Sequence, residues 1–260
     1  MFDSAGVRVG EGGGAAADAR IDDGALVIEF PRSPARVEIA GGMHLADPTI
    51  VCVHRGGPSR VDGAPWFALS ADALGGIMSA HAFERFAACR ALPVEASAYL
   101  AQLVLLESLR AHGAVDPKAI VRTVRAIAAG IVGASVDPDR DRPRPFSPRQ
   151  RDLATRAKML VASRARARLS VRAIAARLGC SVFYLCHTFR DVERTTIGAY
   201  HTQIRVRAGA RRLLEAPSVD LSDLALELGF SSHSHFTAAF RKSFGLTPSA
   251  LMHASKRIAC

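Results

Sequence analysis

The sequence lacks the cysteine patterns that build disulfide frameworks and zinc sites. Its 260 residues hold five cysteines, which are odd in number, scattered along the chain and without any CxxC pair. Disulfide-stapled domains need paired cysteines, and structural zinc sites need closely spaced ones. The pattern therefore predicts a protein of a reducing compartment, with no metal site built on cysteine.

Long hydrophobic runs and a leader segment are also lacking. The most apolar stretch of the later chain, residues 126–136, is far shorter than the roughly 20 residues that a membrane helix needs. The chain does not start with a basic segment followed by an apolar core, as a secretory signal would. We therefore predict a soluble, cytoplasmic protein.

Residues 1–135 show no constellation of catalytic or metal-binding side chains. His44, His54 and His81 are scattered, and no HxH pair with a following carboxylate occurs, as a metal site in a cupin-like barrel would require. A DNA-repair or effector-modifying enzyme would need a nucleophile with partners, or a cysteine cluster, in this part of the chain. Neither is present, so we predict a protein that is not an enzyme and that holds no metal or cofactor.

Positive charge is concentrated in the C-terminal part of the chain. The formal net charge is +10. Residues 1–145 hold 15 basic and 17 acidic residues, whereas residues 146–260 hold 19 basic and 7 acidic ones, which gives net charges of −2 and +12. A strongly cationic domain attached to a near-neutral one indicates a polyanion partner, most commonly nucleic acid, for the cationic part.

The N-terminal part is predicted to form a small β domain. Residues 1–24 are rich in Gly and Ala, so we expect a flexible or loosely packed entry. After it, β-branched and aromatic residues are separated by Pro, Gly and Asp, which is typical of short strands. The predicted strands cover residues 26–30, 35–39, 49–54 and 66–70. Strands at this spacing indicate a small sheet or a partial barrel, of which a cupin-like barrel is one form.

Two helices are predicted between residues 93 and 134. Pro93 stands where a first helical residue would, and Asp116 with Pro117 is typical of the cap and first residue of a second helix. Both helices have an apolar stripe and a short turn joins them, so we expect an antiparallel hairpin. One interpretation of the stripes is packing against the sheet, another is a dimer interface, and the two are compatible.

A proline-rich segment, residues 135–148, separates this part from the rest. Its sequence SVDPDRDRPRPFSP cannot form a helix or a central strand, so we place the domain boundary there. The chain then repeats itself, because SVRAIAARLGCS at 170–181 aligns with DLSDLALELGFS at 220–231. In both copies an apolar helical stripe ends at a glycine, Gly179 or Gly229, and a second amphipathic helix follows. Each copy therefore predicts a helix-turn-helix unit.

A helix over about residues 197–215 is predicted to join the two units, and another, near residues 148–163, precedes the first unit. The joining helix spans about 28 Å at 1.5 Å per residue, close to the roughly 34 Å of one duplex turn. This length would allow both helix-turn-helix units to enter successive major grooves on one face of DNA. Thr247 and Pro248 are predicted to start a short closing helix.

The sequence ALELGFSSHSHFTAAFRKSFGLTP, residues 225–248, together with IRVRAGARRLLE, residues 204–215, resembles the AraC/XylS family of bacterial transcription regulators. The resemblance covers residues 147–255, the family's DNA-binding domain, and the N-terminal part is more loosely similar to the family's sensor arrangement. It implies a promoter-binding regulator, usually an activator that contacts RNA polymerase, often under the control of a small effector. The implied partners are double-stranded DNA, RNA polymerase, an effector and a second copy of the chain.

The first recognition helix is predicted to face DNA with four side chains. Leu185 and Phe189 point inward in the helical pattern. The outward residues are Phe183, Tyr184, His187 and Arg190. His187 and Phe183 match positions from which members of the resembled family reach base edges, although that family commonly has Arg in place of His187, and histidine cannot copy its bidentate guanine contact. The alternative is that Phe183 and Tyr184 pack against the joining helix.

The second recognition helix is predicted to bury Phe236, Ala239 and Phe240 and to face DNA with the residues between them. The predicted DNA-contacting residues are His233, Ser234, Thr237, Ala238 and Arg241. Ala238 stands where the resembled family often has Arg, so it lacks a donor, but its methyl group can touch a thymine methyl. Specificity would then rest more on backbone positioning and DNA shape.

Arg194 is a further departure from the family pattern, which usually has Gly after the first recognition helix. A non-glycine residue in the left-handed conformation costs about 1 kcal/mol or more, so we expect this turn to be reshaped. The other arginines of this part of the chain are candidates for phosphate contacts or, equally, for contacts within the protein.

Together these features predict an α+β fold. Residues 1–134 are predicted to form a sensor and dimerisation domain, β-rich over 25–70 and helical over 93–134. Residues 135–148 form the linker. Residues 149–260 form the DNA-binding domain, with helix-turn-helix units at 170–190 and 220–244. The predicted function is sequence-specific regulation of transcription, and the alternative is a ligand-independent architectural DNA-binding protein.

Overall fold

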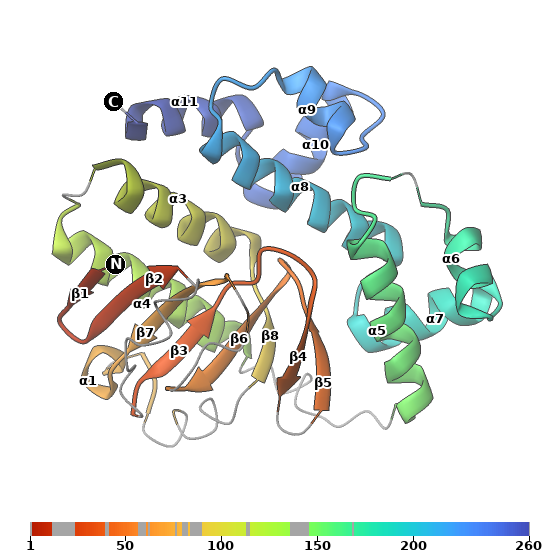
Figure 1. The fold of residues 1–260 in the computed structure, drawn as a ribbon, viewed down its shortest axis with the longest axis horizontal. Helices are drawn as coiled ribbons and strands as arrows, with labels where there is room; N and C mark the ends of the chain where they lie inside the picture. Colours follow the sequence, from red (N-terminus) through yellow and green to blue (C-terminus); the bar gives the residue numbers. More distant parts are fainter. Residues whose placement is uncertain are drawn as a thin grey trace. The chain divides into compact units, whose positions relative to one another are not determined.

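The chain forms two compact units, Met1–Arg142 and Pro143–Cys260. The first contains β-strands and a pair of long helices, and the second is helical, as the predicted α+β fold requires (Figure 1). The computed structural model describes residues 2–11, 24–39, 42–56, 61, 63–75, 77–79, 83, 90–112, 115–135, 146–167 and 169–259. Within these ranges, no helix is both long and apolar enough to cross a membrane.

An antiparallel six-stranded sheet, ordered β1-β2-β7-β3-β6-β8, organises the first unit, and β4 pairs with β5 separately. The strands are β1 Phe2–Ser4, β2 Val7–Glu11, β3 Leu26–Glu29, β4 Ala35–Ile39, β5 Gly42–Ala46, β6 Ile50–Arg55, β7 Pro65–Leu69 and β8 Arg90–Pro93. Strands thus occur at all four predicted segments. The sheet is open within the described residues, with β1 and β8 at its edges.

Two sequence-based expectations for this unit were wrong. The entry segment is not loosely packed over residues 2–11, because β2 pairs with β7 and buries Val7 and Val9. Pro93 does not start a helix: it ends strand β8, paired with Ile50 at the sheet edge, where the missing N–H costs least. The helix begins at Ala96 instead. Residues 12–23, His81 and residues 136–145 of the linker lie outside the described residues.

Both faces of the sheet are buried. The strand register puts Val9, Phe67 and Ile28 on one face, and Val27 and Trp66 on the other, and all five are at most 3% exposed. The helices α3, Ala96–His112, and α4, Pro117–Ser135, lie against this unit's sheet, and the short helix α1, Ala71–Leu74, follows β7 (Figure 1). Their apolar stripes are buried within the chain, as the packing interpretation requires. The buried stripe residues include Tyr99, Leu103, Leu106, Ile120, Val124 and Ile127.

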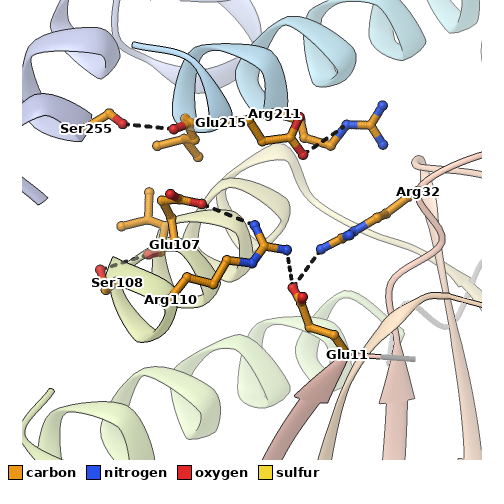
Figure 2. A network of polar contacts seen from close by, with 10 residues as sticks. Glu11, Arg32, Glu107, Ser108, Arg110, Arg211, Glu215 and Ser255 are labelled. Atoms are coloured by element: carbon orange, nitrogen blue, oxygen red, sulfur yellow. Dashed lines mark hydrogen bonds and ion pairs between the residues drawn. The ribbon is translucent and has the colours of Figure 1, made fainter. Parts of the chain in front are cut away.

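A carboxylate on β2 ties strand and helix together. Glu11 accepts hydrogen bonds from Arg32, at 2.7 Å, and from Arg110 of α3, and Arg110 also reaches Glu107 at 3.2 Å (Figure 2). On α4, Arg125 donates to the carbonyl oxygen of Gly75 at 2.6 Å. A charged donor therefore ties α3 to strand β2, and another ties α4 to the end of the short helix α1.

His54 is the one predicted metal candidate whose side chain lies in the described residues. It is buried, its Nδ1 lies 2.8 Å from the carbonyl oxygen of Arg55, and its Nε2 lies 3.6 Å from a carboxylate oxygen of Glu29. The described residues contain no group of three or more His, Cys, Asp or Glu side chains that could hold a metal ion. His54 therefore lies next to one carboxylate, not in a cluster of ligands.

The second unit consists of two helix-turn-helix units joined by a long helix. The helices are α5 Pro148–Ala162, α6 Val171–Leu178, α7 Val182–Glu193, α8 Ile197–Glu215, α9 Leu221–Glu227, α10 His233–Phe244 and α11 Pro248–Ala259. Polar side chains cap their N-termini, among them Ser181 before α7 and Ser232 before α10. Thr247 accepts from the backbone N–H of Ala250 at 3.2 Å, so the predicted start of the closing helix is confirmed.

The helix α8 is shared by two hydrophobic cores. Its first half contributes Tyr200 and Ile204 to a core that includes Phe189 of α7 and residues of α5 and α6. Its later half brings Gly209 against the second helix-turn-helix unit. A methyl group at position 209 would lie 3.0 Å from atoms of Leu228 and Phe236. A methyl group at position 209 would be in tight contact with these side chains, which would have to shift by a few tenths of an ångström.

The two turn glycines adopt the left-handed conformation in very different surroundings. Gly179 has φ of 68°, and a methyl group there would meet nothing within 4 Å. Gly229 has φ of 79°, and a methyl group would lie 2.4 Å from the carbonyl oxygen of Arg166. Only the second turn therefore requires glycine for space as well as for conformation.

We expect Gly229→Ala to destabilise the second unit by about 3 kcal/mol, because backbone conformation and a backbone clash both oppose the methyl group. Gly179→Ala is the matched control and should cost only about 1 kcal/mol, the left-handed penalty alone. Urea unfolding followed by circular dichroism measures both. Equal losses would show that the loop at Arg166 yields without cost.

The turn after α7 keeps its left-handed geometry, so the expectation of a reshaped turn was wrong. Arg194 has φ of 58° and ψ of 18°, and its N–H bonds to the carbonyl oxygen of Arg190 at 2.9 Å. The surrounding packing therefore holds a non-glycine residue in the conformation that glycine adopts more readily.

Arg194→Gly should raise the free energy of unfolding by about 1 kcal/mol, because it removes the clash of a Cβ atom in the left-handed region. Arg194→Ala keeps the Cβ atom and should leave stability nearly unchanged. A gain in the alanine variant as large as in the glycine variant would assign the effect to the arginine side chain instead. Urea midpoints of the three proteins decide this.

Candidate nucleic-acid interface

The outward face of α7 carries unusually exposed aromatic side chains. Ser181 accepts from the backbone N–H of Tyr184 at 3.1 Å and fixes the start of the helix. Leu185 and Phe189 are fully buried beneath it, as predicted. Phe183 is 82% exposed and Tyr184 is 45% exposed, so packing of these rings against the joining helix is not what the structure shows. His187 and Arg190 are exposed on the same helix.

His187 is held by two neighbours one helical turn away on either side. Its ring stacks on Phe183, with centroids 6.0 Å apart and planes 3° apart. Its Nε2 lies 3.2 Å from Oδ2 of Asp191. When Nε2–H donates to Asp191, Nδ1 is the ring nitrogen that remains for a further partner. The imidazole therefore has an aromatic neighbour and a carboxylate neighbour on the exposed face of α7.

The outward face of α10 lines a hollow of about 710 Å³. All five residues predicted for this helix line it, and Lys242 and Thr247 complete the lining. His233, Ser234, Ala238 and Arg241 are exposed, and Thr237 is half-buried with Oγ1 3.4 Å from Nε2 of His233. Phe236 and Phe240 are buried on the other side, whereas Ala239 is only half-buried. The hollow combines small side chains with basic ones.

Asp191 and Lys242 were not among the residues predicted to face DNA, and Thr247 was predicted only as the start of the closing helix. Asp191 follows His187 by four residues, a spacing that brings helical side chains together, so this pairing had a detectable signal. Lys242 follows Arg241 near the end of α10. Among the candidate arginines, Arg207 is 4% exposed and Arg166 pairs with Glu227 at 3.0 Å, so both have roles within the protein.

Comparisons with known proteins identify this arrangement. A family profile described as a helix-turn-helix domain matches residues 174–254. The regulatory protein SoxS of Escherichia coli (strain K12) is 36% identical over 87 residues, which are 33% of this chain and 78% of SoxS. The chain belongs to the AraC/XylS family. As a member, it is a DNA-binding transcription regulator, a class to which its relatives belong.

Two further similarities fall in the same group. The transcriptional regulator Rob of Salmonella typhimurium (strain LT2) is 38% identical over 90 residues, which are 34% of this chain and 30% of Rob. The crystal structure of a Chromobacterium violaceum transcriptional regulator with an AraC-type DNA-binding domain is 25% identical, with a TM-score of 0.39. That match covers 42% of this chain and 96% of the other.

In this AraC/XylS-family protein a buried histidine links α8 to the loop after α5. Nε2 of His201 lies 2.8 Å from the carbonyl oxygen of Ala165, which also accepts from Nε of Arg205 at 2.7 Å. Burial lowers the pKa of His201 below its ordinary value near 6.5, and the charge of Arg205 lowers it further, while the hydrogen bond to Ala165 acts in the opposite direction. His201 is therefore neutral at neutral pH and donates through Nε2.

We expect the stability of the second unit to fall as the pH decreases below about 6.5. The pKa of His201 is lower in the folded protein than in the unfolded chain, so the unfolded chain binds the proton first. The stabilisation is complete above the unfolded pKa and declines as the pH falls toward the folded one. His201→Gln keeps an N–H donor but cannot titrate, so urea unfolding at pH 7.5, 6.5 and 5.5 should give it a shallower pH dependence. Identical dependence in the two proteins would contradict the role of His201.

Proposed function

We propose that this AraC/XylS-family regulator reads promoter DNA with the outward faces of α7 and α10, which enter successive major grooves. The observation that carries the proposal is the exposure of both faces above buried aromatic cores, in a part of the chain with net charge +12. The proposed contact residues are Phe183, Tyr184, His187, Arg190, His233, Ser234, Thr237, Ala238 and Arg241. Positive charge attracts the phosphate backbone, and the exposed side chains reach the base edges.

The first helix-turn-helix unit reads bases through Phe183 and His187. An exposed phenyl ring suits contact with a thymine methyl group. The free Nδ1 of His187 accepts a hydrogen bond when the ring is neutral, so it suits the amino group of adenine or cytosine in the major groove. A histidine held in this way reads a different base edge from the arginine that the family commonly carries there.

The second helix-turn-helix unit depends more on DNA shape and on contacts with the DNA backbone. Ala238 offers a methyl group to thymine, Ser234 and Thr237 offer hydroxyl groups, and Arg241 with Lys242 suits phosphates. The hollow along α10 leaves room for the edge of a duplex. Fewer strong base contacts imply that DNA shape contributes a larger share of specificity here.

In this proposal the protein is an activator that contacts RNA polymerase and acts in the cytoplasm, where bacterial DNA lies.

The first compact unit, Met1–Arg142, binds a small effector and pairs with a second copy of the chain through the helices α3 and α4. A hollow of about 370 Å³ between the β1–β2 turn and α4 supports effector binding. Lys118, Arg122 and Arg125 line it beside apolar atoms, which suits an organic anion.

The competing role is a ligand-independent architectural protein that binds DNA without reading its sequence. Selection of bound duplexes from random DNA separates the two. A regulator should prefer its selected site over random DNA by at least about 1000-fold at physiological salt. A ratio near one would refute the regulator and support the architectural role.

His187→Ala and Arg241→Ala should weaken DNA binding in different ways. Loss of His187 should relax the preference at one base pair, because it removes a base contact. Loss of Arg241 should weaken binding to all sequences and reduce the salt slope by about one, because it removes a phosphate contact. Fluorescence anisotropy over a salt series, with single-base-pair variants of the selected site, measures both effects.

Arg8→Ala is the matched control for charge. Arg8 lies on β2 in the first unit and pairs with Asp3 at 2.9 Å. The Arg8→Ala substitution removes the same charge as Arg241→Ala, but it should leave both the base-pair preference and the salt slope of DNA binding unchanged. If His187→Ala and Arg241→Ala also leave DNA affinity unchanged, the assignment of the DNA-facing residues is wrong.

A further inference from the structure

The loop between α5 and α6 is bridged by a single arginine of α8. Nε of Arg205 donates to the carbonyl oxygen of Ala165, and Nη2 donates to that of Ala167, both at 2.7 Å. His201, one turn earlier on α8, lies 2.8 Å from the same Ala165 oxygen. Two main-chain acceptors in the loop that leads into the first helix-turn-helix unit are thus held by one planar guanidinium group.

The same guanidinium group faces the turn of the second unit. Its central carbon lies 5.7 Å from the centroid of the Phe230 ring, within the range of a cation–π interaction. A methyl group at Gly229 would lie 2.8 Å from Nη2 of Arg205, so the turn backbone is in close contact with it. Phe230 packs in turn against Phe236 of α10, with ring centroids 5.3 Å apart. Arg205 therefore lies at the junction of the two units.

A second contact across this junction is much more exposed. Arg166 pairs with Glu227 at 3.0 Å, but these side chains are 71% and 41% exposed. Exposed ion pairs contribute little, because water and salt screen them. Hydrogen bonds from a charged, planar donor to main-chain oxygens are stronger and more directional. Arg205 is therefore better suited than this ion pair to resist rotation of the first unit about α8.

We propose that Arg205 sets the spacing between half-sites that the protein accepts on DNA. The proposal rests on the proposed entry of α7 and α10 into successive major grooves. One additional base pair moves a half-site by about 3.4 Å along the duplex and by about 35° around it. A junction that resists rotation about α8 cannot follow that movement, so misplaced half-sites are rejected. Arg205 thus acts through the positions of α7 and α10, as a positioning residue that does not touch the bases.

Arg205→Lys tests this role in the full chain. Lysine keeps the positive charge and the aliphatic stem, but it lacks the planar fork that reaches two carbonyl groups. The probes are the duplex selected by the wild type, the same duplex with one base pair added or removed between half-sites, and each half-site alone. Fluorescence anisotropy should show that the wild type loses about tenfold or more in affinity on the shifted duplexes. The variant should lose only about twofold, with half-site affinities unchanged.

Arg211→Lys is the control on the same helix. Nε of Arg211 lies 3.9 Å from Oε1 of Glu215, and both residues belong to α8. The control should keep the wild-type preference for spacing. Circular dichroism establishes that each variant is folded, and Phe230→Leu, which removes the ring but keeps an apolar side chain, replaces Arg205→Lys if that variant is not. Equal weakening of the variant on all spacings overturns the proposal, as does a wild type that binds its selected site but ignores spacing. A wild type that selects no sequence refutes the proposed function itself.

Discussion

Both recognition helices depend on α8, because this one helix completes two separate hydrophobic cores. Tyr200 and Ile204 on its first half pack with Phe189 of α7. Gly209 on its later half admits Leu228 and Phe236 of the second helix-turn-helix unit. Each core is small, and a small core stabilises a fold only marginally. Sharing a helix lets each unit support the other, and it makes their separation a property of a continuous backbone.

Helical periodicity explains why the second unit could be predicted closely from the sequence. Apolar residues every three or four positions, followed by a glycine, leave few alternatives to a helix and a turn. The strands of the first eleven residues could not be found in this way. β2 is only five residues long, and it is a strand because it pairs with β7, more than fifty residues later. Strand formation there depends on tertiary contacts that no local pattern reports.

The outward faces of α7 and α10 could be predicted because burial of two or three residues fixes the orientation of a whole helix. The environment of the outward residues could not. Phe183 is apolar, and an apolar ring is more often buried than exposed, so its exposure is known only from its neighbours in the structure. The stacking of Phe183 on His187 has the four-residue spacing that brings helical side chains together, whereas the two carbonyl groups that Arg205 bridges lie 40 and 38 residues away, so only the packed chain brings them together. The sequence pattern predicts which residues lie on the surface of a helix, but it does not predict the contacts that their side chains make there.

In the contact between α8 and the loop after α5, mutation can remove the side-chain donors but not the main-chain acceptor. The acceptor at residue 165 is a main-chain oxygen, so replacing the alanine side chain leaves that oxygen in place. A scan of single substitutions would therefore detect the arginine and the histidine that donate, whereas at residue 165 it would report only on the side chain, which is half-buried and packs against a hydrophobic core. The effect of a substitution at residue 165 would then reflect that packing and would not reveal the hydrogen bonds that its main chain accepts from α8.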